Sequence, residues 1–151
     1  MAKKLTAPAI NKEYSKYNER TTIPIMNGKY EITIAKYFKK SDIAKLILDY
    51  ISLREELNTF TEKKYTFDDV TFLFSILLIK YFSNLELPSS ADELMAFVNK
   101  LVDLEILGAI VDALPVDQVK QVNKWLDQAL KNLPETLKLL GVGDNADIGS
   151  N

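Results

Sequence analysis

Three pairs of adjacent carboxylates are the residues of this sequence whose type suits acid–base chemistry. They are Glu55-Glu56, Asp68-Asp69 and Asp92-Glu93. A general acid and a general base must converge across a cleft, in environments that separate their pKa values, whereas neighbours in a helix point about 100° apart. The second and third pairs also follow expected helix starts, where acidic side chains complement the helix dipole. The pairs therefore indicate helix surface and not an active site.

Histidine and cysteine, the other residues on which protein chemistry most often depends, are absent. Without His the chain lacks the usual general base at neutral pH and the commonest metal ligand, and without Cys it lacks thiolates and disulfides. Gly141-Val-Gly143 lacks the Lys-Ser/Thr of a phosphate loop, and Asp144 to Asp147 lack the further oxygen ligands of a calcium loop. We therefore predict no catalytic, cofactor-binding or metal-binding residue, and a protein that is not an enzyme.

Basic and aromatic residues are mixed in the segment Lys36-Tyr37-Phe38-Lys39-Lys40. Such mixtures occur where proteins contact nucleic acid. No recognised nucleic-acid-binding motif surrounds this segment, however, and the remainder of the chain is acidic, so nucleic acid is not the partner that we predict. Trp125 lies on an apolar helical stripe, and we expect it in the core and not in a ligand site.

The composition is that of one ordinary domain. The chain has 151 residues, of which 47% are hydrophobic and 26% charged, enough to bury a core. The basic start, Met1 to Leu5, leads into polar residues where a signal peptide would need an apolar run. The most hydrophobic stretch, Val70–Phe82, is shorter than the roughly 20 residues of a membrane span. We therefore expect a cytoplasmic protein that is not secreted and that contacts no membrane.

Charge is distributed unevenly, although the net charge is only −2. Residues 1–40 carry nine Lys or Arg against three Asp or Glu, residues 41–83 carry five against seven, and residues 84–151 carry five against eleven. A basic front and an acidic back favour head-to-tail contact between copies, or docking on a partner of opposite polarity. The same pattern also fits a basic flexible arm followed by ordinary solvated helix faces.

An arm without regular structure is predicted for residues 1–21. This segment is polar, contains Pro8 and shows neither helical nor strand periodicity. Tyr14 and Tyr17 are its aromatic residues. They either dock on the body or on a neighbouring chain, or face solvent.

A β-hairpin is predicted next. Asn27-Gly28 lies between the β-rich runs 22–26 and 29–34, and Asn-Gly is the preferred sequence of a two-residue hairpin turn, because both positions need positive φ. Pro24 cannot donate to a ladder, so its strand should lie at a sheet edge. A lone hairpin is marginal in water, so this one must pack on helices or pair with another chain.

Two helices should follow. Ser41 is the expected N-cap of the first, which should end near Asn58 before a polar connection over 59–65. Thr66 is the expected cap of the second, Phe67–Phe82. Its apolar residues cover nearly every face, and a helix of this kind is either central to the fold or shared with another subunit.

The C-terminal half carries further helical patterns. Ser90-Ala-Asp-Glu93 matches a capping box, and the apolar pattern after it runs to Leu114, as one long helix or as two joined near Asp103. Gly108 weakens this region by about 1 kcal/mol relative to Ala, and we expect it to permit close approach by another helix. Pro115 should begin a last helix, which Pro134 stops.

The predicted fold is mainly α: a small N-terminal β-hairpin followed by a bundle of four to five helices. We divide the chain into a flexible basic arm (1–21), a single helical domain with the hairpin (22–140) and a disordered tail (141–151). A short apolar turn over 137–140 precedes the Gly-, Asp- and Asn-rich tail.

The order of these parts resembles the tail assembly chaperones of long-tailed, siphovirus-type bacteriophages. Three stretches carry the resemblance, which covers residues 25–135. They are Lys29-Tyr-Glu-Ile-Thr-Ile leading into Ser41-Asp-Ile-Ala-Lys-Leu-Ile; Leu77-Leu-Ile-Lys-Tyr-Phe-Ser-Asn-Leu-Glu-Leu-Pro; and Leu104-Glu-Ile-Leu-Gly followed by Val119-Lys-Gln-Val-Asn-Lys-Trp-Leu. No binding residue of that family can be carried over onto a position of this sequence.

The resemblance implies a non-catalytic protein that coats the long helical tape measure protein before the tail tube assembles. Such a protein would self-associate on its substrate, so a homo-oligomer is expected, in the cytoplasm of the host cell if the chain is phage-encoded. The alternatives are a structural neck or head–tail connector component and a small helical regulator. A connector would remain in the virion, whereas a regulator would bind DNA with steep salt dependence.

Changing Asp68, Asp69, Asp92 or Glu93 singly to Asn or Gln should leave function intact, because none of them belongs to a convergent site. We expect stability losses of about 0.5 kcal/mol from weaker helix-dipole interactions, measurable by thermal denaturation. Copurification reports partner binding, and complementation of a strain that lacks the gene reports function. A variant that keeps its fold and its partner but abolishes function would contradict the binding-protein interpretation.

Overall fold

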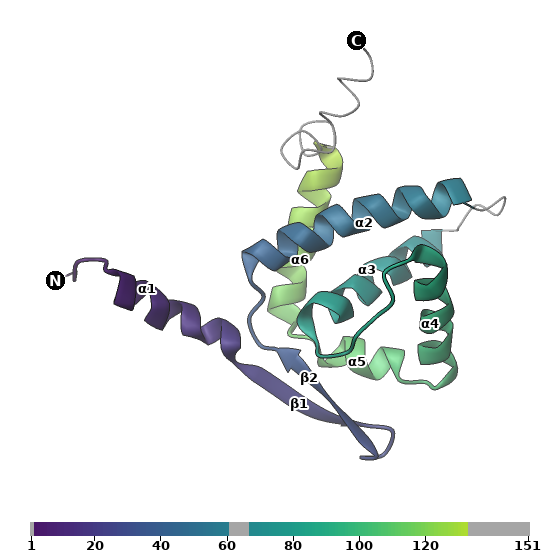
Figure 1. Ribbon diagram of the computed structural model, residues 1–151, viewed down its shortest axis with the longest axis horizontal. Helices are drawn as coiled ribbons and strands as arrows, with labels where there is room; N and C mark the ends of the chain where they lie inside the picture. The colour runs from purple at the N-terminus through teal and green to yellow at the C-terminus, as the bar shows by residue number, and fades with distance from the viewer. Residues whose placement is uncertain (1, 61–66, 133–151) are drawn as a thin grey trace, which may run out of the picture.

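The computed structural model describes residues 2–60 and 67–132. Within them the chain is mainly helical with one N-terminal antiparallel hairpin, which confirms the predicted fold class. The elements are α1 (Ala7–Tyr14), the 3-10 helix η1 (Ser15–Asn18), β1 (Arg20–Ile25), β2 (Tyr30–Ala35), α2 (Lys40–Phe60), α3 (Phe67–Phe82), α4 (Ala91–Asp103), α5 (Leu107–Ala113) and α6 (Val116–Lys131). α2 packs on α3, α4 and α6, and α5 packs on α3 and α4, while α1 extends away from this body (Figure 1).

A single hydrophobic core joins the hairpin to the helices. It runs from Ile32 and Ile34 of β2 to Val122 of α6. α3 supplies its centre, with Leu73, Ile76, Leu77, Leu78, Ile79 and Phe82 all at most 3% exposed. Burial of each such side chain stabilises the fold by about 1.5–3 kcal/mol. At these positions α3 is therefore central to the fold and not shared with another subunit, whereas Phe72 remains 42% exposed.

The hairpin turn is longer than the sequence predicted. The strands pair from Arg20 with Ala35 to Ile25 with Tyr30, which leaves the four residues Met26–Lys29 as the turn. Asn27 and Gly28 have positive φ, as expected, but φ of Met26 is also positive, at +53°. The prediction of a two-residue turn was wrong because Met26 leaves the extended conformation and takes no part in the ladder.

β1 is the edge strand of the hairpin, as Pro24 predicted, and β2 pairs further with the segment after α3. The backbone N–H of Thr33 donates to Asn84 Oδ1 at 2.9 Å, and the Thr33 carbonyl accepts from the backbone N–H of Asn84 at 3.0 Å. Ile34 also forms an isolated antiparallel bridge with Ser83. The hairpin thus packs on the helices of its own chain, which is one of the two arrangements expected.

α2 begins before its predicted cap. The carbonyl of Lys39 accepts from the backbone N–H groups of Asp42 and Ile43, each at 3.0 Å, so Lys39 occupies the N-cap position and Ser41 lies inside the first turn. The preceding residue is fixed by tertiary contacts: the ring of Phe38 stacks on that of Phe82, and its N–H donates to Gln118 Oε1 at 2.9 Å. These contacts override the local capping preference.

The apolar pattern after Ser90 forms two helices, and the Ser90 cap is as predicted: its Oγ accepts from the N–H of Glu93 at 3.3 Å. α4 ends in a Schellman motif, because Ile106 N–H donates to the Leu101 carbonyl and Glu105 N–H to the Val102 carbonyl. Glu105 has φ of +61°, where Gly is usual. A glutamate in this place explains why the sequence alone left the break undecided.

Gly108 does not mediate a helix contact within the described chain. A Cβ built on it would meet no atom within 4 Å. The close approach that we expected from this glycine is therefore absent among residues 2–60 and 67–132, and its side of α5 is open.

The arm contains regular structure, contrary to the prediction. α1 is capped by Thr6, whose Oγ1 accepts from the N–H of Ala9 at 3.2 Å, and Pro8 lies in its first turn. Pro8 is compatible with this helix, because a first-turn residue has no intrahelical partner for its N–H and proline is tolerated there. None of the residues of α1 is buried.

Several predictions fall on residues outside the described ranges. They concern the Thr66 cap, the end of α6 at Pro134, the apolar turn over 137–140 and the tail over 141–151. None of the described helices combines the length and hydrophobicity that a membrane span requires.

Replacing Glu105 with Gly should stabilise the protein by roughly 1 kcal/mol, because glycine adopts positive φ without the steric cost that a Cβ imposes. Urea denaturation measures the change. The reciprocal control is Gly28→Ala in the hairpin turn, where φ is +81° and a loss of about 1 kcal/mol is expected. If Glu105→Gly lowers the free energy of unfolding as much as Gly28→Ala does, backbone strain at Glu105 does not control the stability of this site.

Candidate protein-binding surfaces

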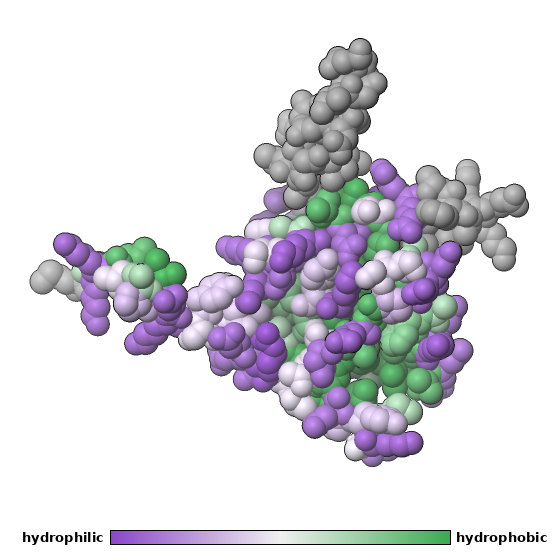
Figure 2. Space-filling model, in the orientation of Figure 1, coloured by the Kyte–Doolittle hydropathy of each residue, from purple (hydrophilic) through white to green (hydrophobic). Residues whose placement is uncertain are grey.

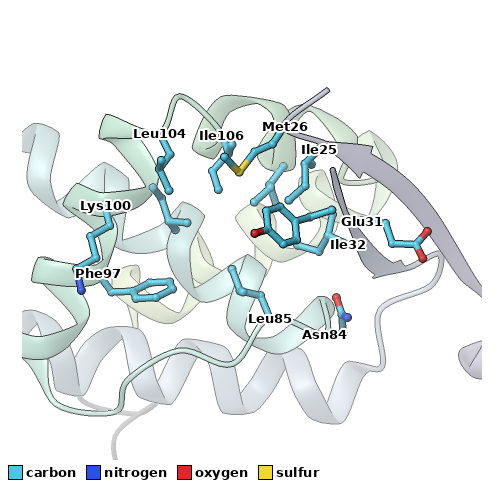
Figure 3. A pocket seen from close by; sticks show the side chains of 13 residues that line it. Ile25, Met26, Glu31, Ile32, Asn84, Leu85, Phe97, Lys100, Leu104 and Ile106 are labelled. Carbon is cyan, nitrogen blue, oxygen red and sulfur yellow. The ribbon is translucent and has the colours of Figure 1, made fainter. Parts of the chain in front are cut away.

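An apolar groove of about 380 Å³ lies between the hairpin tip and the helices α4 and α5 (Figure 3). Its apolar lining is Ile25, Met26, Tyr30, Ile32, Leu85, Phe97, Leu101, Leu104, Ile106 and Ile110, and its polar members are Glu31, Asn84 and Lys100. We call it the hairpin groove. Leu104 and Tyr30 are the most open of its large side chains, at 53% and 55% exposed.

Three elements set the two walls and the floor of the hairpin groove. Phe97, Leu101 and Leu104 are spaced i, i+4 and i+7 on α4, so they share one face of that helix. Ile25 and Ile32 come from the two strands and form the opposite wall, while Leu85 follows the end of α3 (Figure 3). The apolar side chains near the turn are left partly open, with Met26 37% and Tyr30 55% exposed.

The hairpin groove offers few groups for chemistry. Asn84 is already engaged by the backbone of Thr33, which leaves Glu31 and Lys100 as its ionisable side chains. Such a surface is suited to holding apolar side chains of a partner, with one carboxylate and one ammonium group available to orient it.

The pairs Asp92-Glu93 and Glu55-Glu56 do not line the hairpin groove. Asp92 and Glu93 are exposed in the first turn of α4, and Glu55 and Glu56 lie on α2; the side chains of the Asp68-Asp69 pair are outside the described set. Among the described residues no group of three or more carboxylates could hold a metal ion. Whether the chain lacks catalysis stays a prediction.

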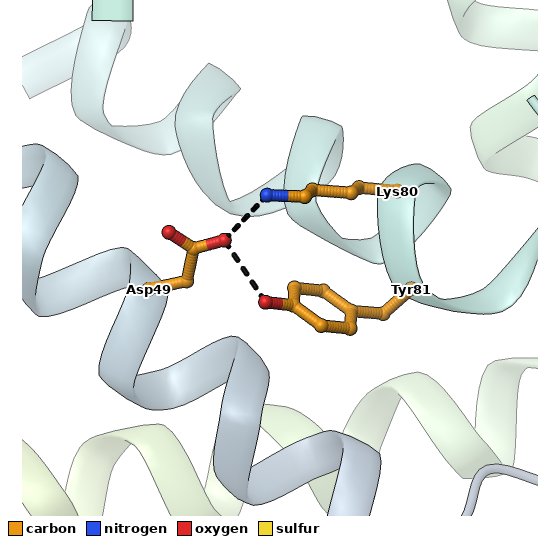
Figure 4. A network of polar contacts seen from close by, with 3 residues as sticks. All are labelled: Asp49, Lys80 and Tyr81. Atoms are coloured by element: carbon orange, nitrogen blue, oxygen red, sulfur yellow. Dashed lines mark hydrogen bonds and ion pairs between the residues drawn. The ribbon is translucent and has the colours of Figure 1, made fainter. Parts of the chain in front are cut away.

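A polar network joins α2 to α3 (Figure 4). One oxygen of Asp49, Oδ2, accepts from Lys80 Nζ at 2.8 Å and from the Tyr81 hydroxyl at 3.0 Å. Burial, together with the hydrogen bond to Asp49 and its negative charge, raises the pKa of Tyr81 to about 12. The two charged side chains are only 26% and 23% exposed. The network therefore joins two packed helices, and Asp49 and Tyr81 also line a shallow surface pocket of about 310 Å³.

A second, shallower apolar surface surrounds Gly108. It is lined by Phe72, Val102, Glu105, Leu107 and Gly108 and encloses about 240 Å³. We call it the α5 patch. Phe72 and Val102 are 42% and 45% exposed, and nothing stands within 4 Å of a Cβ built on Gly108.

The basic and aromatic segment before α2 is divided between core and surface. Phe38, 2% exposed, stacks on Phe82 and is unavailable to a nucleic-acid base. Lys39 Nζ lies 5.3 Å from the ring centroid of Tyr14, and Lys16 Nζ lies 5.7 Å from that of Tyr37. These cation–π contacts hold the base of α1 against the connection between β2 and α2. Tyr14 thus docks by one edge and still stays 49% exposed.

Comparison with known proteins places the chain in a family. The YomO family model matches residues 7–142, which begins at the first residue of α1 and continues past α6. The chain belongs to the YomO family.

One relative is the SPbeta prophage-derived protein YomO of Bacillus subtilis (strain 168). It is 26% identical over 140 residues, which cover 90% of this chain and 80% of the relative. No solved structure matches the chain. The family match includes α1, so the arm helix is part of the region shared with YomO proteins.

Neither surface was predicted from the sequence. The apolar helical pattern after Ser90 included Val102 and Leu104, and both are exposed in the structure. Apolar residues on more than one face of a helix can indicate contact with another chain. In the sequence we recognised this pattern only in α3. Trp125, expected in the core, is partly buried and packs against it.

Tyr81→Phe should lower stability by about 1 kcal/mol at neutral pH, because the hydroxyl loses its hydrogen bond to Asp49. The raised pKa means that Tyr81 ionises at lower pH in the unfolded chain than in the fold, so wild-type stability falls as pH rises from 10 towards 12. The Tyr81→Phe variant lacks the part of this stability loss that comes from ionisation of Tyr81. Urea denaturation of both proteins across that pH range measures the difference, since the other six tyrosines are common to both.

A constant stability difference between the two proteins at all pH values would contradict the assigned network. Tyr50, whose pKa burial also raises, is unchanged in the variant and so does not contribute to the difference.

Proposed function

We propose that this chain is a phage-encoded, non-catalytic assembly protein that binds a helix of another protein chain. More specifically, we propose that it is a tail assembly chaperone, which coats the tape measure protein in the host-cell cytoplasm before the tail tube forms. The observation that carries the proposal is the hairpin groove, a largely apolar surface beside an otherwise well-filled core.

The lining of the hairpin groove supports a helical occupant. An amphipathic helix presents apolar side chains at i, i+3, i+4 and i+7, and it binds by laying that stripe into a groove. Phe97 on α4 and Leu104 just after its end lie on one side of that helix about two turns apart, with the buried Leu101 between them. An apolar stripe of a partner can therefore contact Phe97 and Leu104 along the α4 axis. Glu31 on one wall and Lys100 on the other supply charges that would orient the partner.

The phage context comes from the family. The SPbeta relative is prophage-derived, and a phage origin supports a structural or assembly role for this chain. The resemblance in the order of parts to tail assembly chaperones narrows that role to the tape measure protein. A long helical substrate would offer many equivalent apolar stripes, which agrees with a groove built mostly from aliphatic and aromatic side chains.

Co-expression with a phage tape measure protein should yield a complex. Leu104→Lys, which places a charge at an exposed position of the groove, should reduce the amount of partner recovered by about tenfold or more, because a buried ammonium group without a carboxylate is costly. Lysine is compatible with the C-terminal end of α4, where it complements the helix dipole. Affinity copurification with quantified band ratios provides the measurement.

Asn99→Lys is the matched control, since it introduces the same residue on the exposed opposite face of the same helix. It should leave recovery unchanged. Equal recovery with both variants would exclude the groove as the binding site. A wild-type chain that captures no helical partner, but is retained in purified virions, would favour the connector role instead.

A further inference from the structure

α1 keeps its apolar side chains in solvent. Ile10 and Tyr14 are spaced i and i+4 on one face of the helix and are 51% and 49% exposed, and Leu5 just before it is 78% exposed. Figure 2 shows hydrophobic surface on this arm, well separated from the body. An isolated helix of eight residues is marginal in water. Its apolar face therefore calls for a surface on which to pack.

The body of the same copy does not supply that surface. In Figure 1 α1 leaves the side of the molecule that is opposite α4, whereas the α5 patch lies where α4 meets α5. The contacts of Tyr14 with Lys39 and of Lys16 with Tyr37 hold the base of the arm in this direction. The apolar face of α1 is thus presented to another molecule.

The α5 patch offers a matching apolar surface. Phe72, Val102 and Leu107 surround Gly108, and the missing side chain of that glycine allows a helix backbone to approach closely. The patch offers two exposed apolar side chains, Phe72 and Val102, beside the buried Leu107, and the arm offers Leu5, Ile10 and Tyr14. The hairpin groove would remain free, because Val102 lies about 100° around α4 from Leu101 of the groove.

The charges of the arm and the α5 patch favour a second copy of this chain, and not an unrelated chain, as the partner of α1. Residues 101–119 carry Asp103, Glu105, Asp112 and Asp117 and no Lys or Arg, a net charge of −4. Residues 2–20 carry five Lys or Arg against two Glu, a net charge of +3. Glu105 itself lines the patch. The arm and the patch of this chain are therefore complementary in sign as well as in hydrophobicity.

We infer that α1 of one copy docks on the α5 patch of a second copy. Arm and patch are different surfaces at opposite ends of the molecule, so the contact is heterologous and builds chains or rings of copies in place of a closed two-fold dimer. An eight-residue helix buries less than the about 1,200 Å² of total surface that stable complexes exceed. The association is consequently weak, and it depends on concentration and on salt. This inference stands apart from the proposed partner, whose groove it does not occupy.

Sedimentation velocity of the full chain over a concentration series tests the contact. The wild-type protein should form species larger than a dimer at low salt and fewer of them at high salt, because the charges are screened. Ile10→Asp on the arm and Val102→Lys in the patch each place a repulsive charge in the contact. Each variant alone should sediment as a monomer where the wild type associates, with its dissociation constant raised by about tenfold or more.

Mixing the two variants gives the decisive measurement. The intact arm of the Val102→Lys protein should dock on the intact patch of the Ile10→Asp protein, so an equimolar mixture should form a one-to-one heterodimer and nothing larger. Asn11→Asp and Val116→Lys add the same charges at exposed positions outside the contact and should associate as the wild type does. Should Val102→Lys fail to fold by circular dichroism, Glu105→Lys replaces it as the patch variant.

Three outcomes would overturn the inference. They are a wild type that is monomeric at every concentration and salt, variants that associate as well as the wild type, and a mixture that forms no heterodimer. Capture of the helical partner reports separately on the proposed function, because Ile10→Asp should leave the hairpin groove and its partner binding unchanged.

Discussion

The stacked rings of Phe38 and Phe82 hold the hairpin to the helical body, and the hairpin groove depends on that contact. The ring centroids are 3.7 Å apart with planes inclined by only 5°, and both side chains are at most 3% exposed. Phe38 lies between β2 and α2, and Phe82 ends α3. Asn84, two residues further on, bonds both backbone groups of Thr33. The ring contact thus fixes the hairpin wall of the groove against the segment that leads into α4, and it also sets where α2 begins and where α1 departs.

Local rules predicted the elements whose ends are set by local chemistry. The bounds of α3, the Ser90 cap, the edge position of Pro24 and the positive φ of Asn27 follow from side-chain type and spacing over a few residues. Local rules failed where a tertiary contact or an unusual residue prevailed. The first turn of α2 is set by the Phe38 contacts, the αL position after α4 is held by Glu105 in place of Gly, and Pro8 stands inside the first turn of α1.

The hairpin groove could not be predicted from periodicity, because its walls come from residues 25–32 and 84–110, which are distant in sequence. The apolar spacing of α4 identifies side chains that avoid water, but it does not tell which of them the chain covers by itself. Leu101 is 3% exposed, whereas its neighbour Val102 is 45% exposed. That difference arises from the end of α4 and the short α5, which leave one face of the junction without a covering helix. The excess of apolar residues predicted protein binding. Only the fold shows which of these residues remain exposed and which surfaces they form.

The hairpin groove and the arm contact lie on separate surfaces, so one copy could use both at the same time. A copy bound through its hairpin groove to a long helix would hold its arm close to the next copy, so the second contact would form within one assembly, at an effective concentration that free copies do not reach. The arm and patch then need little affinity of their own, and a weak contact has the advantage that dilute free copies associate little before the partner is present. The opposite charges of arm and patch would give all copies the same direction along the partner. A single helix of eight residues, marginal by itself, is sufficient for that task because it has only to choose neighbour and orientation while the groove supplies the binding energy.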